Sequence, residues 1–227
     1  IGFFTRFAVS DKWRFTPLHW AARHADADVV ALLLDKGLRV NALAQDGTTP
    51  LMLAARRGRA MRHDDIRVAR HLIDSAADVT QPRLLFEAVR YGSTEGVLLL
   101  LEAGVDPRAD IGASTGLHGF SVRGDLVALD ALLAAGAEIN ARDPNGRTPI
   151  FRALTYADPE VIERMIEAGA DPTIPDDTGL SALQLAVSID HPSPDNIALV
   201  VAPGADPNLR NAVGETPLHI LARRGAA

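Results

Sequence analysis

Near the middle of the chain, the apolar and polar positions predict a turn followed by two short helices. Residues 143–146, Asp-Pro-Asn-Gly, have the composition of a turn, and Thr148 followed by Pro149 is typical of a capped helix start. After a break at residues 157–158, apolar side chains recur on one face of a second helix. They are Val161, Ile162, Met165 and Ile166. Gly169 then ends this helix, since glycine adopts the left-handed cap conformation without a steric penalty.

The same turn and helix pair recurs along the chain at a nearly fixed period. Subtracting the positions of the aligned segments gives gaps of 33, 34, 32, 33, 33 and 35 residues. The aligned positions are Thr16, Thr49, Arg83, Thr115, Thr148, Ser181 and Thr216. A constant period of this length, with two helices in each unit, indicates a repeat architecture in which each unit covers the apolar face of its neighbour.

The motifs at the repeat boundaries resemble those of the ankyrin repeat family. Thr16-Pro-Leu-His19 and Thr216-Pro-Leu-His219 match the family's opening motif, and Ala168-Gly-Ala-Asp171 matches its closing motif. The resemblance covers nearly the whole chain and implies an all-α solenoid of helix-turn-helix units joined by β-hairpin-like loops, here called fingers. It predicts about six full repeats plus half-repeats at both ends, forming a single domain over residues 1–227.

The second repeat departs from this pattern twice. Residues 58–65 add about six positions between its two helices, and about five positions are lacking after Ala77-Asp-Val79. Gln81-Pro82 therefore leads directly into the next helix. We expect one enlarged interhelical loop and one missing finger before the third repeat.

Composition limits the classes of protein to which the chain can belong. The 227 residues are 47% hydrophobic but only 5% aromatic, which fits thin helices packed through Leu, Ala, Val and Ile. There is no cysteine, which excludes disulfides and cysteine-bound zinc and fits a cytoplasmic protein. A secreted or periplasmic location stays open, because the chain begins at Ile1 and its natural N-terminus is out of view. The net charge of −6 argues against a nucleic-acid partner, and no apolar run is long enough for a membrane span.

Potential metal ligands occur without the spacing of a known metal site. The resemblance implies that His19, His118 and His219, at the fourth position of the opening motif, form hydrogen bonds between repeats. His63-Asp64-Asp65 together with His71 is the only dense group of ligands, and it matches no specific motif. We interpret it as an acidic surface loop and predict no bound metal.

Catalytic motifs are likewise missing from the sequence. There is no Gly-x-Ser-x-Gly elbow and no phosphate-binding glycine loop. The paired carboxylates Asp176-Asp177 lie in a predicted hairpin that water reaches, so we expect nothing to raise their pKa. We therefore predict a noncatalytic protein without a cofactor.

In ankyrin repeat proteins the exposed side of each first helix and the finger tips form a concave groove. By resemblance, two positions per repeat face this groove, and these fourteen positions hold seven arginines and no carboxylates. Arginine suits bidentate recognition of carboxylates, so we expect a partner protein with an acidic surface. Basic residues at these positions also serve solubility and helix capping in the family. The groove residues predicted to bind the partner are Arg23, Arg56, Arg57, Arg90, Tyr91, Arg123 and Tyr156.

Aromatic residues near the N-terminus form a second candidate binding patch. Trp13 and Phe15 stand where other fingers carry polar residues, and an exposed aromatic residue on a finger is a natural hot spot. The alternative interpretation is that both residues pack on a preceding segment.

These observations favour a noncatalytic scaffold that holds another protein along the groove. One alternative is a regulatory or targeting domain of a longer polypeptide whose catalytic part lies outside this chain. A third interpretation is an enzyme that uses the loop from His63 to His71. The Ala- and Arg-rich composition suits a GC-rich bacterial genome.

Overall fold

The computed structural model describes most of the chain and divides it into two compact units. The described residues are 14–24, 26–56, 65–91, 94–111, 114–119, 125–190, 192–201 and 203–225. Unit 1 spans Ile1–Asp106 and unit 2 spans Pro107–Ala227. The expectation of a single domain over residues 1–227 stays a prediction.

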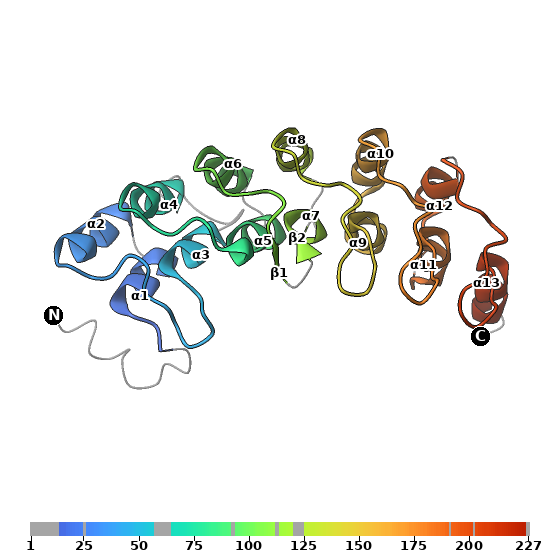
Figure 1. Cartoon of the computed structure of the whole chain (residues 1–227), viewed down its shortest axis with the longest axis horizontal. Coiled ribbons are helices and arrows are strands. Elements are labelled where there is room, and N and C mark those ends of the chain that lie inside the picture. The colour runs from blue at the N-terminus through green and yellow to red at the C-terminus, as the bar shows by residue number, and fades with distance from the viewer. Residues whose placement is uncertain are drawn as a thin grey trace. The chain divides into compact units, whose positions relative to one another are not determined.

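Unit 1 contains six helices in its described residues. They are α1 (Pro17–His24), α2 (Ala27–Asp35), α3 (Pro50–Ala55), α4 (Asp65–Asp74), α5 (Pro82–Tyr91) and α6 (Thr94–Glu102). The first helices of successive repeats, α1, α3 and α5, pack side by side, and so do the second helices α2, α4 and α6 (Figure 1). Each repeat thus contributes one helix to each of two layers.

Unit 2 repeats the same arrangement and adds one short hairpin. Its described elements are β1 (Asp110–Ile111), β2 (Ser114–Thr115), α7 (Gly116–Gly119), α8 (Leu126–Ala134), α9 (Pro149–Tyr156), α10 (Pro159–Glu167), α11 (Ala182–Ser188), α12 (Pro194–Val201) and α13 (Pro217–Gly225). Helix α11 packs between α9 and α13, and α10 packs against α12. The two strands pair antiparallel just before α7. The predicted all-α repeat fold is confirmed in both units.

Local sequence signals start and end these helices. The Ser181 hydroxyl accepts from the backbone N–H of Gln184, and the Gln184 side chain accepts from the N–H of Ser181, which completes a capping box. Thr148 has the extended backbone of an N-cap, but its hydroxyl makes no capping hydrogen bond. The predicted side-chain cap is therefore wrong at this position, although Pro149 does begin the helix.

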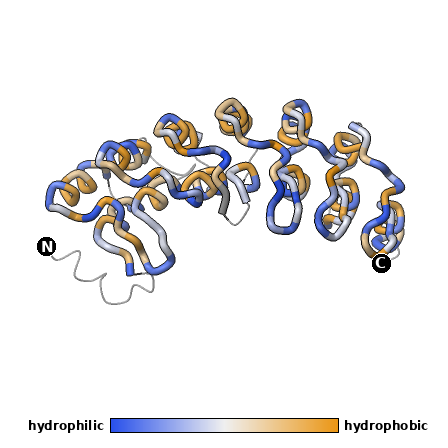
Figure 2. Tube along the Cα trace, viewed as in Figure 1, coloured by the Kyte–Doolittle hydropathy of each residue, from blue (hydrophilic) through white to orange (hydrophobic). Residues whose placement is uncertain are grey.

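Aliphatic side chains of equivalent positions fill the core between first helices. The third residue of the opening motif is at most 3% exposed in the repeats that have a following neighbour in the described part of the chain. These residues are Leu18, Leu51, Leu85, Leu117, Ile150 and Leu183. The trace coloured by hydropathy shows the same division, with apolar helices and polar fingers (Figure 2). Burial of this repeated stripe ties each repeat to the next, as the period predicts.

The connector between α4 and α5 lacks a finger, as the sequence predicts. It runs only from Ser75 to Gln81, whereas residues 36–49 form a full finger between α2 and α3. Its first half is regular, because Asn41 accepts from the N–H of Asp78 and donates to the carbonyl of Ala76. Asn140 makes the equivalent pair of bonds to Asp171 and Gly169 in unit 2. The predicted enlarged loop at residues 58–65 lies almost entirely outside the described residues.

Candidate protein-binding surface

Buried histidines connect neighbouring repeats through their rings. The backbone N–H of Thr115 donates to Nδ1 of His118 at 3.1 Å, so the ring proton lies on Nε2, which donates to the carbonyl of Arg147 at 3.0 Å. His19 makes the same pair of contacts, to Thr16 and to the carbonyl of Thr48. Burial lowers the pKa of His118 below its ordinary value, more than its hydrogen bond to Arg147 raises it. These histidines have the structural role that the family resemblance implies.

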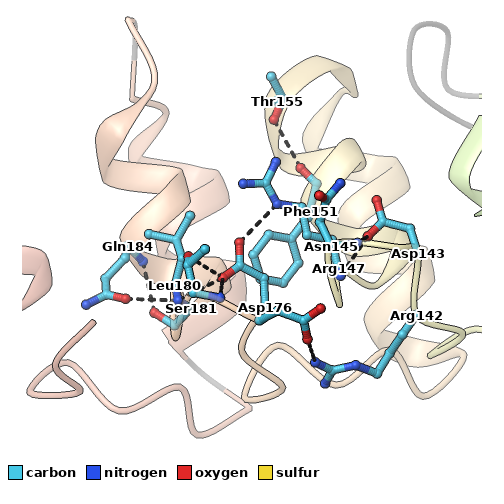
Figure 3. A network of polar contacts seen from close by, with 12 residues as sticks. Arg142, Asp143, Asn145, Arg147, Phe151, Thr155, Asp176, Leu180, Ser181 and Gln184 are labelled. Carbon is cyan, nitrogen blue, oxygen red and sulfur yellow. Dashed lines mark hydrogen bonds and ion pairs between the residues drawn. The ribbon is translucent and has the colours of Figure 1, made fainter. Parts of the chain in front are cut away.

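Gln184 performs the same role where the opening motif lacks histidine. Its Oε1 accepts from the N–H of Ser181, and its Nε2 donates to the carbonyl oxygens of Leu209 at 2.9 Å and Glu215 at 2.8 Å. Figure 3 shows Gln184 beside Ser181 at the start of α11. A neutral amide can therefore replace the imidazole, because the geometry requires only one acceptor and one donor.

Asp176 is buried, contrary to the expectation that water reaches this hairpin. The residue is 4% exposed, and its carboxylate accepts from the Thr178 hydroxyl, from the backbone N–H groups of Thr178 and Leu180, and from Nε of Arg147 (Figure 3). Burial alone would raise the pKa of Asp176, but the hydrogen bonds from Thr178, Arg147 and Leu180 lower it overall. This carboxylate fixes one finger against the next.

In unit 1 a buried carboxylate joins two arginines of neighbouring repeats. Oε1 of Glu87 accepts from Nη2 of Arg56 at 2.7 Å and from Nε of Arg83 at 3.0 Å. The Glu87 side chain is 8% exposed and that of Arg56 is 25% exposed. Arg83 also donates from Nη1 to the carbonyl of Asp46. The charge of Arg56, expected to face a partner, is thus largely neutralised within the chain.

Next to this ion-pair network, aromatic rings and arginines share an exposed surface at the end of α5. Tyr91 is 52% exposed, and the guanidinium carbons of Arg56 and Arg90 lie 5.5 and 5.9 Å from its ring centroid. Arg90 also lies 6.0 Å from the ring of Phe86 and is exposed. Cations over aromatic faces hold their side chains in place, which limits the entropy lost on binding. We call Arg90 and Tyr91 the α5 patch.

Unit 2 carries a smaller version of this arrangement at the end of α9. Tyr156 is 56% exposed, and Arg152 lies over its ring with the guanidinium carbon 5.7 Å from the centroid. The Thr155 hydroxyl is turned back to the carbonyl of Phe151 (Figure 3). Tyr156 is therefore the exposed aromatic side chain of this helix end.

Comparison with known proteins agrees with the repeat geometry. The family described as ankyrin repeats (3 copies) matches residues 4–83, and that described as ankyrin repeats (many copies) matches residues 117–166. The chain belongs to the ankyrin repeat family. The ankyrin repeat domain of human ASB11 shares its fold, with a TM-score of 0.79 and 25% identity over 91% of each chain. The predicted family and fold class are both confirmed.

Curated ankyrin repeat relatives are much longer than this chain. The Neurogenic locus notch homolog protein 1 of Danio rerio is 28% identical over 88% of the chain, which spans only 9% of that protein. The ADP-ribosylation factor GTPase-activating protein AGD4 of Arabidopsis thaliana is 33% identical over 43% of the chain and 12% of its own length. Palmitoyltransferase AKR1 of Lachancea kluyveri is 28% identical over 71% of the chain and 22% of its own length. Ankyrin repeats generally serve as noncatalytic modules for protein–protein interaction.

The structure describes some of the predicted binding residues of this ankyrin repeat chain and not others. Trp13, Arg57 and Arg123 lie outside the described residues. Phe15 is half-buried and stacks on the ring of His19 at 5.3 Å, so it packs within its own repeat. Arg23 is exposed at the end of α1. Their role in binding stays a prediction.

Several arginines of the expected basic stripe form ion pairs with carboxylates of neighbouring turns and helices. Among the fourteen groove positions, Arg223 pairs with Glu215 and Arg224 with Asp190, in addition to the pair of Arg56 with Glu87. Arg90, in contrast, has no carboxylate partner among the described residues. Sequence reasoning missed Glu87, although its spacing of four residues from Arg83 on a helix is the signal of a salt bridge.

The described residues contain neither a cluster of metal ligands nor a helix able to cross a membrane. No cluster of three or more His, Cys, Asp or Glu side chains in these ranges is arranged to hold a metal. None of the described helices has the length and apolar character that a membrane crossing requires. The candidate ligands His63 and Asp64 lie outside this part of the chain.

Proposed function

We propose that this ankyrin repeat chain binds another protein through the exposed side of its first helices and its fingers, without catalysing a reaction. The observation that carries the proposal is the α5 patch. Its arginine lacks a carboxylate partner in the described ranges, and its tyrosine is half exposed beside it. Arginine and tyrosine are the residues most enriched at the energetic centres of protein interfaces.

The electrostatics of this surface favour an acidic partner. Arg56, Arg83 and Arg90 contribute three positive charges around the single buried carboxylate of Glu87. The excess positive charge occurs on a chain whose net charge is −6, so it is a local feature. Charge of this kind mainly sets association rate and partner choice, and it is screened by salt.

The proposal is tested by a pull-down from the native source, with Arg90→Glu and Tyr91→Ala as variants of the bait. We expect each variant to capture at least about tenfold less of the acidic partner than the unaltered chain does. A loss of this size is typical of substituting a central interface residue. Arg70→Glu is the matched control, because Arg70 is an exposed arginine of the second-helix layer that pairs with the exposed Glu102. A partner bound equally by all forms, with unchanged affinity at two salt concentrations, would contradict binding at the α5 patch.

A second candidate function is that of a regulatory or targeting module within a longer polypeptide. The observation that favours it is the small share of each relative that the chain covers, including an enzyme named as a GTPase-activating protein and one named as a palmitoyltransferase. The complete reading frame of the gene distinguishes the two, since a catalytic domain in the same frame would support regulation in cis. The relatives named above are eukaryotic, so the expected bacterial source rests on composition alone.

A further inference from the structure

Fingers of unit 2 are joined edge to edge by backbone hydrogen bonds. The N–H of Asp177 donates to the carbonyl of Asn145 at 2.9 Å, and the N–H of Ala212 donates to the carbonyl of Thr178 at 3.2 Å. Asn145 and Thr178 both stand three residues before the first residue of an opening motif, Thr148 or Ser181. An extended neighbouring backbone is therefore what this edge of a finger binds in the same protein.

The finger of unit 1 at residues 36–49 has no such neighbour among the described residues, because the next connector is short. Asp46 stands three residues before Thr49, and its carbonyl accepts from the Arg83 side chain at 3.0 Å instead of from a backbone N–H. A carbonyl oxygen has two lone pairs, so it can accept a second hydrogen bond. The acceptor used between the later fingers is thus still available here.

The surroundings of Gly47, the residue after Asp46, indicate that the described residues leave this edge of the finger uncovered. A Cβ atom at Gly146 would collide with the carboxylate of Asp177, and one at Gly179 would lie 3.5 Å from the backbone nitrogen of Ala212. At Gly47, the equivalent position in unit 1, no atom of the described residues lies within 4 Å of such a Cβ. The described residues therefore leave open, beside Gly47, the space that a finger occupies in unit 2.

The side chains of this edge define what can occupy it. Leu43 is 62% exposed, and it stands at the position of Arg142, which reaches Asp177 of the next finger. The Arg83 side chain is 34% exposed, and its Nη2 has no hydrogen-bond partner among the described residues. An occupant therefore meets an apolar side chain, a backbone acceptor and a guanidinium nitrogen.

We infer that an extended acidic segment of the partner protein binds the open edge formed by Leu43, Asp46 and Gly47, in place of the missing finger. The segment donates a backbone N–H to the carbonyl of Asp46 and places a carboxylate on Nη2 of Arg83. An apolar side chain of the segment covers Leu43. This is strand addition, in which main-chain hydrogen bonds give affinity and side chains give specificity. The inference rests on the proposed function and adds a second contact to the α5 patch.

The test uses an unbiased phage-displayed library of linear dodecapeptides as the probe, selected on the intact chain. In a filled variant, the sequence of residues 175–179 is inserted between Gln81 and Pro82, which restores the five missing residues of the finger. Leu43→Ala is the second variant, since it removes the apolar contact and leaves the charge of the edge unchanged. Arg70→Glu again serves as the control for surface charge.

We expect selected peptides to contain carboxylates and to bind the unaltered chain and Arg70→Glu equally. Both the filled variant and Leu43→Ala should weaken peptide binding by at least about tenfold, a loss typical of a main interface contact. Failure to enrich any peptide, or binding to the filled and Leu43→Ala variants as strong as to the unaltered chain, would overturn the inference. Loss only with Arg90→Glu and Tyr91→Ala would uphold the proposed function while rejecting the open edge.

Discussion

Nη1 of Arg83 donates to the carbonyl oxygen of Asp46 at 3.0 Å, so a side chain replaces the backbone contact that joins later fingers. The same guanidinium uses Nε to bind Glu87, which also binds Arg56. The missing finger is thus compensated by an ion-pair network between the repeats that begin at Thr49 and Arg83. Arg83 occupies the first position of an opening motif, where most of the other repeats have threonine.

Glu87→Gln should destabilise unit 1, because it removes the only negative charge between two arginines. We expect the free energy of unfolding to fall by about 2–3 kcal/mol, below the range for fully buried pairs since water reaches both guanidinium groups. Urea denaturation followed by circular dichroism measures this loss. Glu102→Gln removes an exposed partner of Arg70 and should cost no more than about 0.5 kcal/mol. Equal effects of the two substitutions would contradict the bridging role of Glu87.

His118→Gln should make stability less sensitive to acid while keeping the contact between repeats. The pKa of His118 in the folded state is lowered from 6.5, so its contribution to stability is complete above that pH and is lost as the pH falls through the folded value. Glutamine has no such titration and makes both hydrogen bonds, as Gln184 does. Free energies of unfolding at pH 7.5 and 5.5 should differ less in the variant than in the unaltered chain. At pH 7.5 the two should agree within about 1 kcal/mol. A larger pH effect in the variant would disprove this assignment.

Thr148→Val and Thr115→Val should have opposite outcomes although both replace the first residue of an opening motif. The Thr115 hydroxyl lies 3.0 Å from Nδ1 of His118, whereas the buried hydroxyl of Thr148 has no hydrogen-bond partner among the described residues, because Phe151 replaces histidine. We expect Thr115→Val to cost about 0.5–1.5 kcal/mol and Thr148→Val to be neutral or stabilising. Thermal denaturation of both variants provides the comparison. A larger loss at Thr148 would mean that its hydroxyl has a partner in solution.

Ala76→Gly should stabilise unit 1. Ala76 has φ of 63° after α4, in a position where glycine follows the second helix of other repeats, as Gly169 does with φ of 93°. The left-handed conformation costs a non-glycine residue about 1–2 kcal/mol, and the greater unfolded-state entropy of glycine offsets part of that, leaving a gain of about 0.5–1 kcal/mol. The reciprocal variant, Gly169→Ala, should destabilise unit 2 by a similar amount. The shift of the urea midpoint gives both values, and a loss on Ala76→Gly would refute the strain argument.

The repeat fold was predictable because its signals are local and recur. Thr-Pro starts, helix-ending glycines and one period fix which residues form helices, and the missing finger follows from counting residues between them. Which polar side chains are buried, and which residues they pair with, was not predictable in this way. Asp176 and Glu87 are buried and each pairs with an arginine of the preceding repeat, and the partner of Arg56 lies 31 positions later. Such contacts depend on how two repeats pack, which the pattern within one repeat does not specify.

The network around Arg83 also determines how neighbouring repeats cooperate. In a repeat array the contact between adjacent repeats sets how far a local opening spreads. Unit 2 joins its fingers with peptide hydrogen bonds as well as with the pair of Arg147 and Asp176. In unit 1 the corresponding contacts are made by Arg83 with the carbonyl of Asp46 and by Arg56 with Glu87, so dissolved ions compete with them directly. Ionic strength therefore adjusts the cooperativity of unfolding at this junction of unit 1.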